Sequence, residues 1–576
     1  MAEVQSALDM SRPRPRSGCS DEEGGAAAVP RHLTHVQPIL LPTGMTRENS
    51  VEAEARQGEH QAMVNAPMAS LYEVTKLRNV RSDPWARGHR AESAGAAASC
   101  AQAEDKKPDF ISQGKLGVPE AERLFASFRR TLNAYLWGGI TLVHDTLDET
   151  RASSPLLTAA ILAVTALHVK DDGRAFDICY PIFLELVSQA VFDRYHTLDD
   201  VRGLCIGAFY LSDLSWKLSG LAVRIATELN LHQSCAMAQR DRPEYVEEAR
   251  LWYLLYVCDH HFSIAYGRPP VICENPTISC HEDFLQLPGT TMSDHRLHSQ
   301  VGVFVILSRI YHTFGPDRSR MIASDDFDIL RRFDADLAHW RNRWKPRLDV
   351  APNPHIADYP AKGVTLHYHF ARLQLFSICL RGLRPTEQYS MSNERRELVN
   401  LAISSAFGAL ELILHDADMR PAVNGVPLYL LTTIAYACLF LMKAQTQWRC
   451  ANLDIRYGDV ASMIEGVVDL LDEVSPCTRH VAHYLGRGLR GMLAKFKEHN
   501  AMESQQQQPQ PQHLQAGQAV AAAPSCADGV SGSMWTDWNS WMLGAGNLSA
   551  GPHFALDQEQ QCGLSFLDAL SAQMPG

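Results

Sequence analysis

The sequence lacks paired cysteines, a basic surplus and the short motifs that mark the common enzyme classes. Its 14 cysteines are scattered, and no two of them are spaced as C-x2-C. We therefore predict free thiols in a reducing compartment. The formal net charge of −12 leaves no basic surplus over the whole chain. Any contact with DNA therefore requires a local basic element.

Enzyme signatures are equally scarce. The chain contains no G-x-G-x-x-G, no G-x-x-x-x-G-K-[ST], no G-x-S-x-G and no H-E-x-x-H. The usual phosphate-binding loops, nucleophile elbows and zinc-protease helices are therefore missing. Residues 1–20 also lack the apolar core of a secretory signal peptide. We predict that the protein is not an enzyme and that it binds no cofactor within this chain.

Composition divides the chain into three regions. Residues 1–116 are largely polar and poor in aromatic residues, which predicts disorder, with a short amphipathic arm near 68–79. Residues 117–500 carry apolar residues at three- and four-residue steps. This spacing predicts one large all-α region of roughly a dozen helices. Residues 501–576 are Gln-rich and contain no Lys or Arg, and we predict a disordered tail there.

One apolar run resembles a membrane span. "GVPLYLLTTIAYACLFLM" (425–442) has no charge over 18 positions, which is near the lower limit for a span. It contains Pro427 and is followed directly by Lys443. We predict a buried helix of the all-α region, and no membrane as a partner.

The stretch "EEARLWYLLYVCDHHFSIAYGRPPVI" (247–272) combines helical spacing with potential metal ligands. A zinc site here would draw on Cys258, His261, Cys273, Cys280 and His281. These residues lack the usual ligand spacing, and neighbouring side chains on a helix diverge by about 100°. A nucleophile pair of Cys258 and His261 lacks an evident orienting group.

We therefore interpret this stretch as a structural helix that ends at Gly267, with a local ion pair between Asp259 and Arg268 beneath the turn. The pair His367 and His369 is also interpreted as structural, because two residues apart on a helix they point in different directions.

Three segments, 153–168, 215–234 and 247–272, together resemble the regulatory domain of fungal Zn2Cys6 (zinc binuclear cluster) transcription factors. This domain is called the fungal-specific transcription factor domain or middle homology region. The last segment follows its pattern R-x-W-W/Y-x-L-Y-x-x-D-x-x-x-S-x-x-x-G-R-P. The matching signature residues are Arg250, Trp252, Tyr256, Asp259, Ser263, Gly267, Arg268 and Pro269. The resemblance implies an all-α regulatory domain in which this segment is structural, neither catalytic nor metal-binding.

The same resemblance implies DNA binding through a six-cysteine cluster that holds two zinc ions. Only Cys19 and Cys100 precede residue 117, so the printed chain carries no such cluster. Zinc is expected only if a six-cysteine cluster lies upstream of Met1. Alternatively, the protein is a scaffold or inhibitor that does not bind DNA itself and pairs with a zinc-cluster factor.

The C-terminal region has the composition of an activation segment. It carries six acidic residues and two bulky clusters, "MWTDWNSWML" (534–543) and "LSFLDAL" (564–570). Acidic residues keep such a tail solvated, and the bulky residues can dock as a short helix on a partner. The predicted coactivator contacts are Trp535, Trp538, Trp541, Phe566 and Leu567.

Together these features predict a nuclear transcription regulator, an activator of fungal RNA polymerase II genes. The resemblance implies a nutrient-use or secondary-metabolite gene set. It also implies DNA, coactivators and a second subunit, as homodimer or heterodimer, as partners.

Overall fold

The computed structural model describes residues 108–506 except 171–172, 194, 241, 267, 316, 318–319, 351 and 384–390. Within them the fold is all-α, as predicted. No strand occurs in the described part, and one isolated antiparallel bridge joins Asn353 and Ala357. The predicted arm near 68–79, the activation residues and most of the two predicted disordered regions lie outside the described residues.

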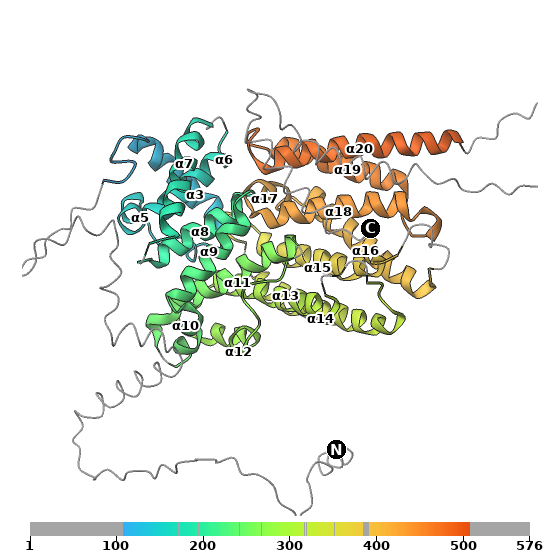
Figure 1. Ribbon diagram of the computed structural model, residues 1–576, viewed down its shortest axis with the longest axis horizontal. Helices are drawn as coiled ribbons and strands as arrows, with labels where there is room; N and C mark the ends of the chain where they lie inside the picture. The colour runs from blue at the N-terminus through green and yellow to red at the C-terminus, as the bar shows by residue number, and fades with distance from the viewer. Residues whose placement is uncertain are drawn as a thin grey trace, which may run out of the picture. The chain divides into compact units, whose positions relative to one another are not determined.

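The helices follow one another through short connections (Figure 1). They are α3 (Val118–Arg130), α4 (Leu132–Tyr135), α5 (Leu147–Ser153), α6 (Pro155–His168), α7 (Gly173–Ala190), α8 (Leu198–Tyr210), α9 (Ser215–Glu228), α10 (Leu231–Ala238), α11 (Val246–Tyr266), α12 (Pro276–Ser279), α13 (Met292–Phe314), α14 (Phe327–Leu348), α15 (Tyr359–Ser377), α16 (Asn393–His415), α17 (Met419–Gly425), α18 (Leu428–Gln447), α19 (Tyr457–Val474) and α20 (Val481–Gln506).

Local sequence signals set several helix starts. Thr146 and Thr197 form capping boxes with the residues three positions later, at the starts of α5 and α8. The Ser154 hydroxyl accepts a hydrogen bond from the Leu157 amide, and Pro155 occupies the first position of α6. These contacts pair amides that have no partner within the first helical turn.

The segment before α3 packs on the helices. Phe110, Ile111 and Leu116 are buried. Arg151 of α5 donates two hydrogen bonds to the Asp109 carboxylate, at 2.7 and 2.9 Å. These bonds lower the pKa of Asp109 to about 2. Residues 108–116 therefore contribute to the core of the helical region.

Helix α11 lies between the N-terminal and C-terminal helices (Figure 1). It packs against α8, α9 and α10 on one side and against α13 and α18 on the other. Residues 251 to 263 of this helix are all buried. A helix that is apolar all round is expected at such a central position.

Helix α18 is the apolar run that resembles a membrane span. Two described helices, α16 and α18, are long and apolar enough to cross a membrane by length and composition alone. The apolar window of α18 is 94% buried among the other helices. Its surface is therefore used for packing within this region, as predicted for the run 425–442.

Residues at the start of the last helix contact the first helices. His480, just before α20, places its Nε2 3.3 Å from Nε2 of His168 at the end of α6. Arg479 donates to the Gly173 carbonyl at 3.1 Å. The described region is therefore closed by contacts between residues about 300 positions apart in the sequence.

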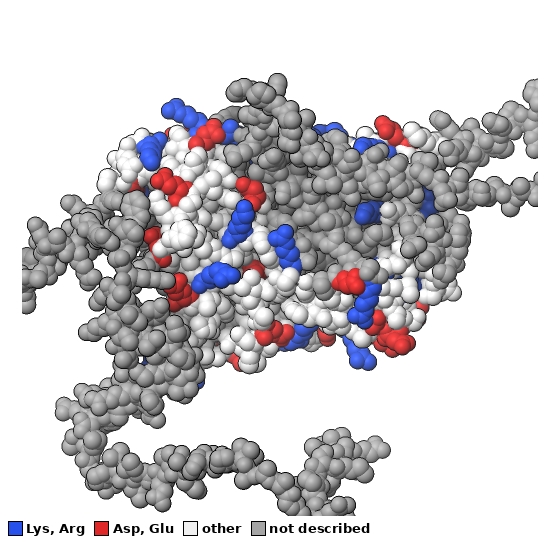
Figure 2. Space-filling model, viewed as in Figure 1, with Lys and Arg blue, Asp and Glu red and all other residues white. Residues whose placement is uncertain are grey.

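The visible described surface is of mixed charge. On the face in Figure 2, Lys and Arg side chains lie beside Asp and Glu side chains. Among the described residues, Glu282 accepts hydrogen bonds from Arg343 at 2.6 Å and Arg347 at 2.8 Å. DNA-binding surfaces are strongly positive, and this face does not have that character.

Candidate functional site

The signature residues lie on α11 and in the turn that follows it. Arg250 faces the start of α13. Its guanidinium donates to both Asp294 carboxylate oxygens, at 2.7 and 3.0 Å, and to the Gly289 carbonyl at 2.7 Å. The Asp294 side chain is fully buried and also accepts the Thr291 amide at 2.7 Å. Arg250 therefore fixes the N-terminus of α13 against α11.

Asp259 holds the turn after α11. One of its carboxylate oxygens accepts the backbone N–H groups of Val271 at 2.7 Å and Ile272 at 2.8 Å. Burial raises the pKa of Asp259 to about 6, and the hydrogen bonds partly oppose this. The predicted ion pair with Arg268 is wrong, because Asp259 faces amides. The Arg268 guanidinium carbon instead lies 4.9 Å from the ring centroid of Trp216.

Two other signature residues pack in the interior. Trp252 and Tyr256 are buried, and the Tyr256 ring centroid is 3.9 Å from that of His260. The Ser263 carbonyl accepts the Arg268 amide at 2.8 Å at the end of the helix. Pro269 is exposed. Gly267 lies outside the described residues.

The potential ligands in the same helix do not converge. Cys258 is buried, its pKa is raised by burial, and Cys205 is a neighbour. His260 Nδ1 bonds to the Tyr256 carbonyl at 2.9 Å, whereas the His261 ring stacks on Tyr429 of α18 with 4.5 Å between centroids. Within the described ranges, no group of three His, Cys, Asp or Glu residues is placed to hold a metal ion.

The remaining members of the predicted ligand set are also dispersed. Cys273 and Cys280 are exposed, and His281 pairs with His298 of α13 at 3.1 Å between their Nδ1 atoms. The two histidines of α15 have different neighbours. His367 packs on Tyr429, whereas a side chain at Gly408 of α16 would meet the His369 ring.

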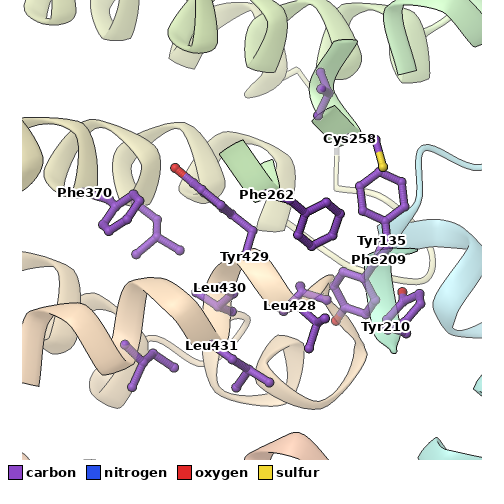
Figure 3. Packing of buried hydrophobic residues seen from close by; sticks show 14 of the residues in the cluster. Tyr135, Phe209, Tyr210, Cys258, Phe262, Phe370, Leu428, Tyr429, Leu430 and Leu431 are labelled. Carbon is purple, nitrogen blue, oxygen red and sulfur yellow. The ribbon is translucent and has the colours of Figure 1, made fainter. Parts of the chain in front are cut away.

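A cavity with a mixed polar and apolar lining inside the helical region was not predicted from the sequence. It lies where α11, α13, α15 and α18 meet the end of α4. Its charged and polar lining includes Arg296 and Gln300 of α13, His261, His367 and Tyr429. Figure 3 shows Tyr429 projecting from the start of α18, with Phe262 and Phe370 on either side in that view.

Arg296 anchors this cavity to the N-terminal helices. Its guanidinium donates to the backbone carbonyls of Ala134 at 2.6 Å and Tyr135 at 2.7 Å. It also lies over the rings of Trp137 and Tyr359, 5.7 and 5.2 Å from their centroids. Burial lowers the pKa of Arg296.

Comparison with known proteins identifies the family. The family described as the middle domain of the transcriptional activator of proteases prtT matches residues 115–496. The chain belongs to this family. It is 47% identical over 476 residues to the transcriptional activator of proteases prtT of Emericella nidulans, covering 81% of this chain and 70% of that protein.

More distant relatives are also named as regulatory proteins. An uncharacterized transcriptional regulatory protein of Schizosaccharomyces pombe is 26% identical over 33% of this chain and 24% of its own. The acetamidase regulatory protein of Aspergillus fumigatus is 31% identical over 22% of this chain and 17% of its own. The predicted resemblance to fungal transcription factors is confirmed, and so is the function of a transcription regulator of the activator type.

Proposed function

We propose that this protein activates the transcription of genes that encode proteases. The observation that supports this most strongly is the 47% identity to the prtT activator over most of both chains. Protease genes are one kind of nutrient-use gene set. The proposal also places the protein in the nucleus, with no catalytic activity of its own and no cofactor bound by its helical region.

In this proposal the prtT-like middle domain is a rigid regulatory body. Its signature residues act on its shape: Arg250 fixes α13 to α11, and Asp259 holds the turn after α11. The middle domain gates the C-terminal segment, in which Trp535, Trp538, Trp541, Phe566 and Leu567 contact coactivators. The Cys and His residues of α11 contribute to packing.

Gene disruption tests whether protease genes are the targets of this protein. Loss of the gene should lower protease transcripts and secreted proteolytic activity, and the full chain should restore both. The disrupted strain should also be complemented with Arg250→Met as a packing-defective variant, with its protein level measured. Unchanged protease transcripts in the disrupted strain would remove the proposed gene set while leaving the role in transcription intact.

The activation segment is tested separately. Residues 501–576 fused to an unrelated DNA-binding domain should activate a reporter gene. Replacing Trp535, Trp538 and Trp541 together with alanine should abolish most of that activity, whereas replacing Gln505, Gln506 and Gln507 should not. A fusion that is inactive although expressed would show that this segment does not recruit coactivators.

DNA binding separates the activator from its alternative, a scaffold or inhibitor that pairs with a zinc-cluster factor. The purified chain should be measured for zinc content and for binding to protease-gene promoters at several salt concentrations. Stoichiometric zinc with sequence-specific binding supports direct DNA reading. Weak, salt-sensitive binding without zinc means that DNA is reached through a partner subunit or an additional cysteine cluster.

A further inference from the structure

A buried cation without a carboxylate partner lies in the interior of the described helices. Arg296 is 6% exposed, and no Asp or Glu in the described part of the chain pairs with it within 4.0 Å. The groups that influence its pKa besides burial are three tyrosines, Tyr135, Tyr210 and Tyr359. A buried charge is costly unless an opposite charge or a set of polar groups compensates it.

The cavity beside Arg296 is lined by buried polar atoms, both donors and acceptors, that have no hydrogen-bond partner in the described region. Within the described region the buried Trp137 Nε1, the Tyr429 hydroxyl and the His261 ring nitrogens make no hydrogen bond of good geometry, and the Gln300 side chain lies beside His261 and partly offsets the lowering of its pKa. The indole N–H is a donor only, the hydroxyl can donate, and a neutral imidazole carries one N–H. Each of these residues is more than 90% buried. These residues and Arg296 therefore line one interior space.

A smaller hollow adjoins this cavity and shares both unpartnered acceptors with it. It shares Arg296, Gln300, Tyr359 and His367 with the larger cavity. His367 Nδ1 lies 2.7 Å from the Gly363 carbonyl and donates to it, so its unpartnered Nε2 is an acceptor, as is Gln300 Oε1. This hollow has a volume of about 10 Å³, the size of one water molecule. A water molecule there would donate hydrogen bonds to Gln300 Oε1 and His367 Nε2.

The size of the larger cavity limits its occupant. Its volume is about 20 Å³. This is room for one or two water molecules or one compact ion, and too little for an amino acid, a sugar or a nucleotide. A cation is disfavoured by Arg296. An uncharged water accepts hydrogen bonds but adds no opposite charge to the backbone carbonyls and ring faces that surround the guanidinium.

We propose that the cavity between α4, α11, α13, α15 and α18 binds one compact monovalent anion, of the size of chloride or formate, against Arg296. The anion accepts hydrogen bonds from Trp137, His261 and Tyr429 and neutralises the guanidinium. It thereby links helices from both ends of the middle domain. This site is independent of the target genes proposed above.

Anion dependence of stability tests the site. Thermal unfolding of the purified full chain is measured at constant ionic strength in sodium chloride, formate, acetate and gluconate. Chloride and formate should raise the midpoint by roughly 1–3 °C relative to gluconate, with saturation, and acetate should have a smaller effect because it is larger. Equal midpoints in all four salts would mean that water alone fills the cavity, and the proposal would be wrong.

Two variants locate the effect. Arg296→Met should abolish the difference between chloride and gluconate. Arg395→Met is the matched control, because Arg395 is also buried and donates to two backbone carbonyls, those of Cys379 and Ile322, over the ring of Phe327. It lines neither hollow, so its variant should keep the chloride effect.

Tyr429→Phe keeps the result decisive if Arg296→Met does not fold. It removes one donor and preserves the ring that stacks on His261. The chloride concentration at half effect should rise at least several-fold. An unchanged chloride response in Tyr429→Phe, or its loss in Arg395→Met, would place the anion elsewhere on the protein.

Discussion

Asp259 shows how one buried carboxylate can support a turn at a cost. One oxygen accepts two amides, while burial raises the pKa of the group to about 6. The folded state therefore binds a proton more tightly than the unfolded chain, in which an aspartate titrates near 3.9. The ionised carboxylate reduces stability progressively as the pH rises through the range from about 4 to 6.

Asparagine and alanine at this position should behave differently. In Asp259→Asn the amide oxygen can keep both hydrogen bonds without a charge to bury, so the loss of unfolding free energy should stay below about 1 kcal/mol. Asp259→Ala leaves two amides unpaired and should cost about 2–4 kcal/mol. Urea unfolding at pH 5 and 7.5 checks both values. If Asn is as damaging as Ala, hydrogen bonding to the turn is not the role of Asp259.

Arg250 compensates the fully buried carboxylate of Asp294. Arg250→Met should therefore cost about 3–5 kcal/mol, because it leaves a buried charge without its partner. Arg331→Met is the control, since Arg331 pairs with Asp328 and Glu394 at the surface and its loss should leave the urea midpoint nearly unchanged. Similar midpoints for the two variants would contradict a structural role for Arg250.

At the scale of elements, the contact between α6 and α8 depends on the absence of one side chain. A Cβ atom at Gly203 would lie 2.9 Å from Cα and 3.0 Å from the backbone N of Leu157. Backbone atoms cannot rotate away, so an added methyl group must push the two helices apart. Gly203 therefore sets the distance at which these helices pack.

Substitution of this glycine should be costly. Gly203→Ala should lower the unfolding free energy by about 2–4 kcal/mol, because overpacking strains the helix pair. Gly220→Ala in α9 is the control, since a Cβ there meets nothing within 4 Å. It should be neutral or stabilise by up to about 1 kcal/mol. Denaturant titration of both variants measures their unfolding free energies. A Gly203→Ala variant as stable as the parent protein would show that α6 and α8 can move apart without loss of stability.

For the whole molecule, buried histidines dominate the expected dependence on pH. Burial lowers the pKa of eight histidines in the described part of the chain. They are His168, His260, His261, His281, His298, His367, His369 and His480. The pKa of His168 and of His367 falls to about 4. The unfolded chain takes up these protons near pH 6.5.

The stability that neutral histidines contribute is therefore complete above about pH 6.5 and is lost as the pH falls towards 4. The effect of Asp259 on stability has the opposite dependence on pH, but it comes from a single group. We expect the thermal midpoint to fall steeply between pH 6.5 and 4.5, with uptake of several protons on unfolding at pH 5.5. Calorimetry in buffers of different ionisation enthalpy measures that uptake. Uptake of fewer than two protons would mean that the histidines are already charged in the folded state.

The sequence predicted those features that depend on local spacing. Apolar residues at three- and four-residue steps indicated the all-α fold, and the charge-free run at 425–442 indicated the buried helix α18. The signature indicated that Asp259 lies at a turn. Arg268 was wrongly predicted as its partner, because the amides of Val271 and Ile272, which Asp259 binds, carry no sequence signal. The cavity at Arg296 could not be predicted, since its lining comes from helices that are distant along the chain.

The contact between His168 and His480 has a consequence for how the protein is made. These residues are 312 positions apart, and a ribosome adds about 5–20 residues per second. Roughly 15–60 s therefore pass between the synthesis of the two partners. During this time the end of α6 at His168 lacks this contact, while α3, α7 and α8, the main neighbours of α6, are already made. Newly made chains should depend on chaperones in that interval, and a nonsense codon before His480 should yield no stable fragment.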